Sequence, residues 1–77
     1  MSRLPIVDAK TMEKALLRLG FSVTRQKGSH KFYRHPDGRT TTVPHPSGSD
    51  LAWPLIREIL REIDLTPEAF QKMLEDL

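Results

Sequence analysis

One short segment, residues 27–39, has a turn signal at each end, and this feature restricts the middle of the chain to a small antiparallel sheet. Gly28 permits a sharp turn, because glycine takes positive φ without a Cβ clash. Residues 36–38 read Pro-Asp-Gly, and Asp-Gly before a threonine-rich run is typical of a tight hairpin. Between the two turns, residues 30–34 have aromatic side chains at their centre and predict one short strand.

Further strands are predicted on both sides of this segment. Residues 21–25 alternate apolar and polar side chains, which indicates a half-buried strand with Phe21 and Val23 facing the core. Residues 39–43 are rich in β-branched side chains and favour a third strand. That strand should end at Pro44, which has no N–H to donate to the sheet.

The central strand carries an aromatic side chain on each of its two faces. One face consists of His30, Phe32 and Arg34, and the other of Lys31, Tyr33 and His35. We expect Phe32 to face the helices, which would place His30 near the edge of the core-facing side. A shift of one residue in strand register would reverse this assignment.

Apolar periodicity predicts three helices around these strands. Residues 8–19 have apolar side chains at three- and four-residue steps, with Asp8 as N-cap and Gly20 as C-cap. Residues 54–63 carry a second apolar stripe and begin with a proline, which suits a first helical turn. Thr66 before Pro-Glu should cap a third, short helix.

The predicted order is therefore a helix, three antiparallel strands, a helix and a short terminal helix. A small sheet with helices on one face is an α+β two-layer sandwich, and its other face is open to a partner. With 77 residues the chain should form one domain, residues 1–77, with a core of about residues 7–65 and a C-terminal helix at about residues 66–77. Residues 44–50 are expected to form a loop by composition.

Composition excludes several classes of site. The chain has no cysteine, so it has neither a disulfide framework nor a thiol nucleophile. Its three histidines are separated by five and ten residues on different predicted strands, with only Asp37 nearby, and match no familiar metal-ligand pattern. We therefore expect no metal and no cofactor. Neither a membrane-spanning run nor the apolar core of a signal peptide is present, so a cytoplasmic location is expected.

Charge is unevenly placed along the chain, although the formal net charge is only +2. Residues 23–45 contain Arg25, Lys27, Lys31, Arg34 and Arg39 against Asp37 alone. Residues 46–77 contain seven acidic side chains against Arg57, Arg61 and Lys72. A basic middle beside an acidic end indicates one surface for an anion such as nucleic acid, or simply a solvated charged surface.

Several of these residues together resemble the HicA family, also described as YcfA-like, of small toxins from toxin–antitoxin pairs. The matching elements are Leu-Gly-Phe at 19–21, the run from Gln26 to His30, the run from Tyr33 to Gly38, Val43-Pro44-His45, and Leu-Ile-Arg-x-Ile-Leu at 55–60. They occur in the family's order and cover about residues 7–65. The Gly-Ser-His element is short, and the complete set makes the resemblance specific.

The resemblance implies a fold similar to a double-stranded-RNA-binding domain. It also implies an mRNA interferase, an endoribonuclease that cleaves mRNA and blocks translation. The family's catalytic histidine is the one in Gly-Ser-His, which corresponds to His30. The resemblance further implies a HicB-type antitoxin protein that holds the toxin inactive.

The residues themselves are compatible with that chemistry. Cleaving RNA without a metal needs a base for the 2′-hydroxyl proton, an acid for the leaving oxygen and charge stabilisation at the phosphate. Histidine suits either proton role, because its ordinary pKa of about 6.5 leaves both forms accessible near neutrality. His30 is the candidate, and either His35 or His45 could supply a second group. By itself, an isolated histidine at a turn is more often a plain surface residue.

The candidate RNA-binding residues surround this histidine. They are Lys27, Gly28, Ser29, Lys31, Tyr33 and Arg34. The cations would contact phosphates, the two turn residues would offer backbone N–H donors, and the tyrosine would stack on a base. A half-buried sheet aromatic is an equally good interpretation of Tyr33. The alternative function is a non-catalytic RNA-binding module of the same fold.

Overall fold

The computed structural model describes residues 6–45 and 50–77, so most of the loop expected at residues 44–50 lies outside the described residues. The described elements are α1 (Ala9–Leu19), β1 (Ser22–Lys27), β2 (His30–Arg34), β3 (Thr40–Pro44), α2 (Trp53–Glu62) and α3 (Pro67–Glu75). This order confirms the predicted α+β fold, α-β-β-β-α with a C-terminal helix, similar to a double-stranded-RNA-binding domain.

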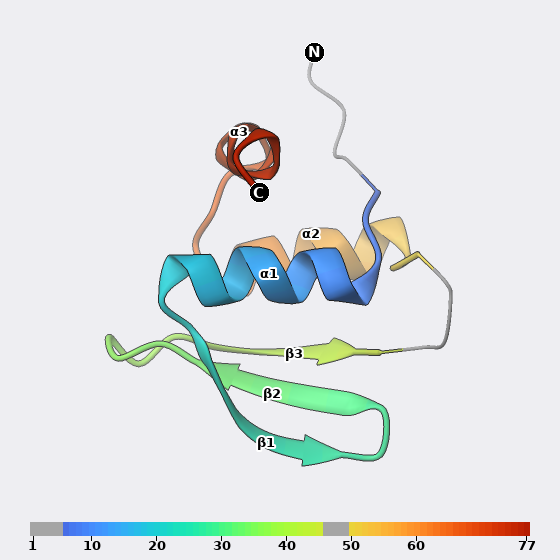
Figure 1. The fold of residues 1–77 in the computed structure, drawn as a ribbon, viewed down its shortest axis with the longest axis vertical. Helices are drawn as coiled ribbons and strands as arrows, with labels where there is room; N and C mark the ends of the chain where they lie inside the picture. The colour runs from blue at the N-terminus through green and yellow to red at the C-terminus, as the bar shows by residue number, and fades with distance from the viewer. Residues whose placement is uncertain (1–5, 46–49) are drawn as a thin grey trace.

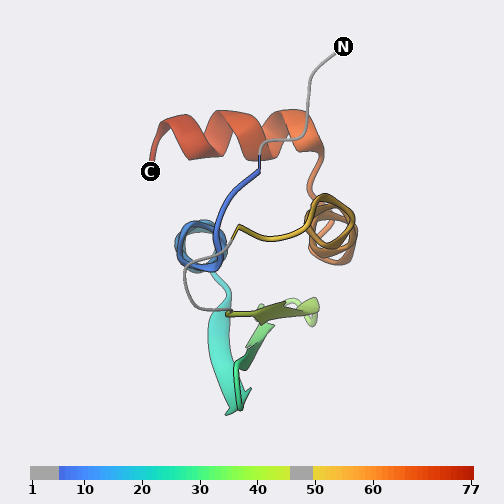
Figure 2. The same ribbon diagram turned by 90° about the vertical axis from the view of Figure 1, so that its right-hand side faces the viewer.

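The elements form layers (Figures 1 and 2). The three strands make one antiparallel sheet in the order β1-β2-β3. α1 and α2 run along one face of the sheet, and both contact β3. α3 crosses on the far side of these helices from the sheet, while β1 and the turn that joins it to β2 curve away from the helices (Figure 2). One sheet face therefore lies under helices, and no described helix lies on the other.

The predicted capping residues set the helix ends. Asp8 accepts a hydrogen bond from the backbone N of Thr11 at 2.8 Å, and hydrogen bonding to the side chain and then the backbone of Thr11 lowers the pKa of the Asp8 carboxyl. Gly20 closes α1 with φ of +102°, a left-handed conformation that glycine adopts without a Cβ clash. Thr66 accepts from the backbone N of Ala69 at 3.1 Å and begins α3. Local sequence thus determines where these two helices start.

β1 contains a bulge that shifts its phase against β2. Val23 lies opposite Tyr33, but Arg25 lies opposite Phe32, so Thr24 is an extra residue on the β1 side. The Thr24 hydroxyl donates to the carbonyl oxygen of Phe32 at 3.3 Å. From Arg25 onward, side chains of β1 therefore lie on the opposite sheet face from the one that simple alternation after Val23 would give.

The expected orientation of β2 was wrong. Tyr33 is buried, with 1% of its surface exposed, whereas Phe32 is only half-buried and lies on the open face. The register explains the reversal, because Tyr33 lies opposite Thr41, a buried residue beneath the helices. A buried tyrosine needs a partner for its hydroxyl, and Glu13 of α1 provides it. The Phe32 ring lies on the open face, where the Arg25 guanidinium lies over it.

The inward orientation expected for β1 is half correct. Phe21 is 2% exposed, and its ring packs edge-on against the ring of His35. Val23 is 43% exposed. It faces the helix side of the sheet, opposite Tyr33, but β1 curves away beyond the reach of the helices (Figure 2). Strand twist therefore leaves this apolar side chain without a cover.

The core fills the space between the covered sheet face and the helices α1 and α2, and it continues between these helices and α3. Its buried apolar side chains are Ala9, Met12, Ala15, Leu16, Phe21, Tyr33, Val43, Leu51, Ile56, Ile59, Leu60, Ile63 and Phe70. Phe70 of α3 is fully buried, so the terminal helix packs on the domain. No helix among the described residues combines the length and the apolar character needed to cross a membrane.

Candidate active site

His30 is the first residue of β2 and directly follows the turn from β1. It lies opposite Lys27 in β1 and Pro44 in β3, at one end of the sheet. Gly28 makes the turn with φ of +59°, and it and Ser29 are exposed. The His30 side chain is also exposed, and within the described part of the chain it takes part in no hydrogen bond or ion pair. Its imidazole is therefore accessible to a ligand.

The bulge in β1 places two cations on the same sheet face as this imidazole. Residues directly opposite each other in an antiparallel pair share a face. Arg25 therefore lies beside Phe32, with its guanidinium carbon 5.9 Å from the ring centroid, and Lys27 lies beside His30. Arg34 is on this face too, two residues further along β2 than Phe32. We call Arg25, Lys27, His30, Phe32 and Arg34 the open-face cluster.

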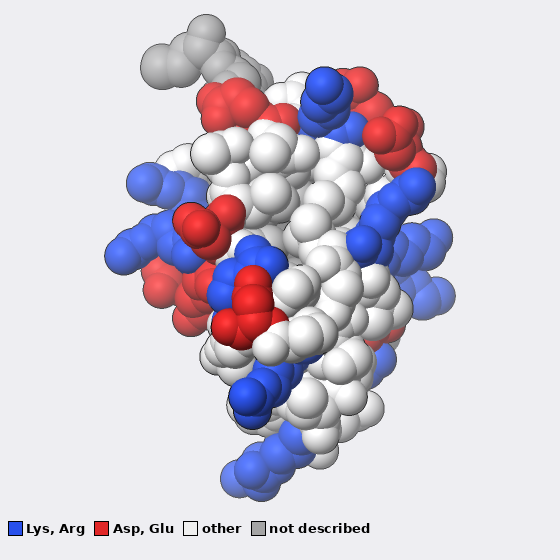
Figure 3. Space-filling model, turned by 90° about the vertical axis from the view of Figure 1, so that its left-hand side faces the viewer, with Lys and Arg blue, Asp and Glu red and all other residues white. Residues whose placement is uncertain are grey.

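Arg25 was not among the residues selected as RNA-binding from the sequence. Simple alternation groups Arg25 with Phe21 and Val23, and the position of a bulge is not evident from the residue types. The one available signal was the absence of acidic residues from positions 22–34. Figure 3 shows the result on one side of the molecule, where the lower end, occupied by the β1–β2 hairpin in Figure 1, has blue side chains and no red ones.

Two of the selected residues, Lys31 and Tyr33, lie on the opposite face, beneath α1. The Tyr33 hydroxyl donates to Oε2 of Glu13 at 2.6 Å, and Lys31 Nζ donates to the same oxygen at 3.1 Å. Because the ring of Tyr33 is buried, it offers no free face for a base, and the expected stacking role does not fit this position. Lys31 is already paired with a carboxylate, so it differs from the cations of the open-face cluster.

His45 completes a polar group on this covered side. Its Nε2 lies 3.1 Å from the Tyr33 hydroxyl, and its backbone N donates to the carbonyl oxygen of Ser29 at 2.6 Å. The hydrogen bond from Tyr33 lowers the pKa of Glu13, and the bond from Lys31 adds to the effect. Burial and the Lys31 charge lower the pKa of His45, against a smaller opposite effect of Glu13. Burial, the bond to Glu13 and its charge raise the pKa of Tyr33.

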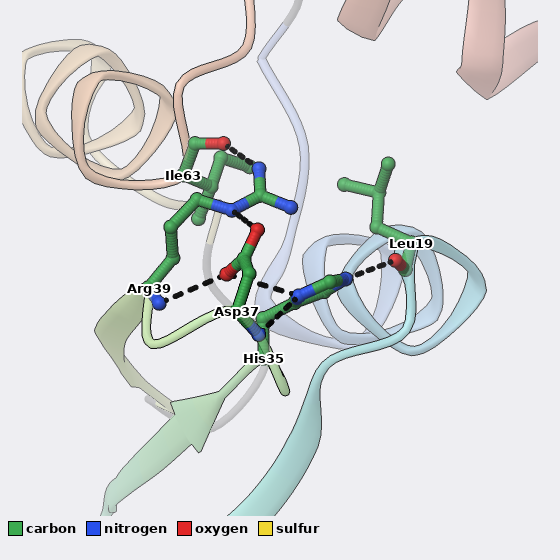
Figure 4. Close-up of polar contacts among 5 residues, drawn as sticks. All are labelled: Leu19, His35, Asp37, Arg39 and Ile63. Carbon is green, nitrogen blue, oxygen red and sulfur yellow. Dashed lines mark hydrogen bonds and ion pairs between the residues drawn. The ribbon is translucent and has the colours of Figure 1, made fainter.

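His35 belongs to the turn between β2 and β3 (Figure 4). Its Nε2 donates to the carbonyl oxygen of Leu19 at 3.2 Å. Its Nδ1 lies 3.1 Å from the backbone N of Asp37 and 3.0 Å from Oδ1 of the same residue. Arg39 pairs with Asp37 at 2.8 Å and donates to the carbonyl oxygen of Ile63. Both nitrogens of His35 face protein atoms, so this histidine ties the turn to α1 and does not face a ligand.

The three histidines thus have different environments. His30 is exposed and has no side-chain partner among residues 6–45 and 50–77, His35 is hydrogen-bonded within a turn, and His45 is half-buried with a partner at Nε2. Among the described residues no group of three or more His, Asp or Glu side chains is placed to hold a metal ion.

The family model described as the HicA toxin of bacterial toxin–antitoxin systems matches residues 9–65, from the start of α1 to the residue before the Thr66 cap. No curated protein sequence matches the chain.

Proposed function

The chain belongs to the HicA family of toxins from bacterial toxin–antitoxin pairs, and we propose that it acts as an endoribonuclease on mRNA. The observation that carries this proposal is the setting of His30: an exposed imidazole, free of partners within the described residues, on a sheet face with three cations and no acid. A ribonuclease needs such an arrangement, because the substrate is a polyanion and the reaction moves protons.

The proposed reaction proceeds through the ribose 2′-hydroxyl. The 2′-oxygen attacks phosphorus, its proton goes to a base, and the P–O5′ bond breaks while an acid protonates the leaving oxygen. His30 is the proposed proton carrier, since imidazole accepts and donates protons near neutral pH. Positioned acid–base help of this kind accelerates a reaction by about 10²–10⁴-fold.

The open-face cluster supplies the proposed RNA contacts. Arg25, Lys27 and Arg34 would contact phosphates on both sides of the scissile bond, and the exposed backbone of Gly28 and Ser29 would add neutral N–H donors. Phe32 takes the place of Tyr33 as the aromatic side chain nearest the substrate. Because mRNA is the proposed substrate, we place the site of action in the cytoplasm.

The partner expected of a toxin from such a pair is an antitoxin, and we propose that it is a HicB-type protein. A protein that covers the open-face cluster should present acidic side chains to it, because cations buried without partners are costly. Covering His30 would also exclude RNA.

Cleavage and binding must be measured separately, since a non-catalytic RNA-binding module would also bind through these cations. Purified wild-type protein and the His30→Ala and Lys72→Ala variants would be assayed on a labelled single-stranded RNA. We expect His30→Ala to bind RNA with wild-type affinity and to lose cleavage by about 10²-fold or more. Lys72 is exposed on α3, so Lys72→Ala should match wild type. Binding without cleavage by the wild type would favour the binding module, and full cleavage by His30→Ala would overturn the role of His30.

A further inference from the structure

Hydrogen bonds through its ring and its backbone hold His45 in place, which distinguishes it from an ordinary loop histidine. RNA cleavage through the 2′-hydroxyl needs two proton transfers, and His30 can carry out only one of them at a time. His35 is unsuitable as the second group, because both of its ring nitrogens face protein atoms. On His45 only Nε2 has a partner within the described residues, and Nδ1 does not.

The direction of the hydrogen bonds around Tyr33 is fixed by proton count. A phenol has one proton, and the short 2.6 Å contact with the Glu13 carboxylate uses it. Glu13 is ionised in this arrangement, because hydrogen bonds from Tyr33 and Lys31 lower its pKa. The Tyr33 oxygen must therefore accept from His45 at their 3.1 Å contact, and Nε2 of His45 must carry a hydrogen.

This chain of bonds selects one tautomer of the neutral imidazole. With its proton on Nε2, the basic lone pair of His45 is on Nδ1. The charged and titratable groups that face the ring are Glu13 from α1 and Lys31 and Tyr33 from β2. Burial and the Lys31 charge lower the pKa of the imidazole, against a smaller opposite effect of Glu13, and so favour its neutral form. With no partner for Nδ1 among the described residues, this neutral imidazole can accept a proton there.

His45 also lies at the same end of the sheet as His30. Pro44, the residue before it, lies opposite His30, and the backbone N of His45 donates to the carbonyl oxygen of Ser29, the residue before His30. The two imidazoles project from opposite faces of this sheet end, His30 on the open side and His45 on the side of Tyr33. An RNA strand that crosses the end of the sheet would pass between them.

We propose that His45 is a second catalytic residue of this ribonuclease, the general base that takes the 2′-hydroxyl proton on Nδ1, with Tyr33 and Glu13 as positioning residues. This inference rests on the proposed function. His45 gains the proton from the 2′-oxygen, the 2′-oxygen bonds to phosphorus, and the P–O5′ bond breaks. The protonated imidazole of His30 gives its proton to the 5′-oxygen. The products are a 2′,3′-cyclic phosphate and a 5′-hydroxyl, and the two histidines return to their starting states through water.

The first test is the tautomer, which does not depend on activity. Long-range ¹H–¹⁵N NMR spectra of the wild type should show His45 with a protonated Nε2 and a bare Nδ1. The Tyr33→Phe variant keeps the ring in the core but removes the acceptor, so its His45 should show a mixture of tautomers. A wild-type His45 with its proton on Nδ1 would overturn the inference, and so would a spectrum that Tyr33→Phe leaves unchanged.

The second test is the pH dependence of cleavage, with Lys72→Ala as the control. We expect His45→Ala to retain RNA affinity, to lose about 10²–10⁴-fold in kcat and to lose the fall in rate at acid pH that protonation of a base produces. Tyr33→Phe should lower kcat with KM unchanged. If His45→Ala cleaved RNA at the wild-type rate, the catalytic role of His45 would be rejected, and the proposed role of His30 would stand. No cleavage by the wild type itself would reject the inference together with the proposed function.

Discussion

The accessibility of each imidazole nitrogen separates the three histidines more clearly than their positions in the sequence do. His30 stands at a turn and His45 beside a proline, and either context is common among plain loop residues. Hydrogen bonds distinguish them, because His35 has partners at both nitrogens, His45 at one and His30 at neither within the described residues.

Expression of the His30→Ala variant in cells should no longer arrest growth. The wild-type imidazole is exposed and contributes nothing to the core, so its removal should leave the fold and the amount of protein unchanged. Growth curves and immunoblots of the same cultures would check this. Arrest by a folded His30→Ala protein at wild-type level would contradict the assignment.

Glu13→Gln should lower the free energy of unfolding at neutral pH and should make it depend less on pH in the acid range. Hydrogen bonds from Tyr33 and Lys31 hold the pKa of Glu13 below its ordinary value of 4.5. The resulting stability is complete above the unfolded-state pKa and is lost as pH falls through the lower, folded-state pKa. At neutral pH the substitution removes charge-assisted hydrogen bonds and should cost about 1.5–3 kcal/mol.

Urea unfolding of wild type and Glu13→Gln at a series of pH values would measure both effects. The difference in free energy of unfolding between the two proteins should become smaller as the solution becomes more acidic. If the difference stayed constant down to the lowest pH, the Glu13 carboxylate would not be the group that titrates.

Among the helices and strands, the bulge in β1 is a feature that the sequence did not predict. The helix caps Asp8, Gly20 and Thr66 act within a few residues of themselves, so their effects are readable from the sequence. The faces of β1 and β2 depend on register, which is settled by contacts with β3 and α1. That is why the three helices and three strands were predicted correctly, while the orientation of Phe32 and Tyr33 was reversed.

The candidate site was predictable to the same extent. Gly28, His30 and Lys27 lie together because they are neighbours across one tight turn, which the sequence indicates. The hydrogen bonds of Tyr33 join residues separated by 20 and 12 positions, and no repeating pattern in the sequence predicts such pairs. Long-range polar contacts of this kind could not be inferred from one chain.

Replacing Arg25 and Lys27 together should weaken RNA binding and flatten its dependence on salt, whereas Lys31→Ala should not. Each lost phosphate contact should reduce the slope of log affinity against log salt by about 0.7 on single-stranded RNA. Lys31 is the matched control, because it is a cation of the same hairpin that pairs with Glu13 on the other face.

The comparison would use the His30→Ala background, so that RNA remains intact during the titration. Equal slopes for wild type and the Arg25→Ala/Lys27→Ala protein would show that RNA does not bind the open-face cluster. An equally large effect of Lys31→Ala would show that the helix side of the hairpin binds RNA as well.

Phe70→Ala should destabilise the domain by about 3–5 kcal/mol, the usual cost of removing a buried phenylalanine side chain. Phe70 is fully buried although α3 lies beyond the family match at residues 9–65. The free energy of unfolding in urea would measure the loss. Gln71→Ala, at an exposed position of the same helix, should stay within about 0.5 kcal/mol of wild type. A small loss in Phe70→Ala would mean that α3 contributes little to the core.

The two faces of the sheet differ: one is buried against the helices, and the other is the face that we propose binds RNA and the antitoxin. The covered face buries Tyr33, Thr41 and Val43 under the helices. The open face is basic and has no described element on it, and the space-filling view shows an acid-free lower end on one side of the molecule (Figure 3). A partner that binds there can block the proposed catalysis without disturbing the fold.

Hydrogen exchange of the toxin with and without a HicB-type antitoxin should locate that partner. We expect slower exchange over residues 25–34 in the complex, and unchanged exchange in α3, which lies on the far side of the helices from the sheet (Figure 2). Protection of α3 alone, with residues 25–34 exchanging freely, would mean that inhibition does not work by covering the site.

The bulge also decides how this chain tolerates a change in length. Deleting one residue from a strand normally moves every later side chain of that strand to the opposite face of the sheet. In β1 the extra residue, Thr24, is already present, so its deletion would yield a regular ladder in which Arg25 still lies opposite Phe32 and Lys27 still lies opposite His30. The hairpin that carries the proposed site can therefore lose a codon there and keep its arrangement, whereas the loss of a codon from β2, which pairs on both sides, would invert it.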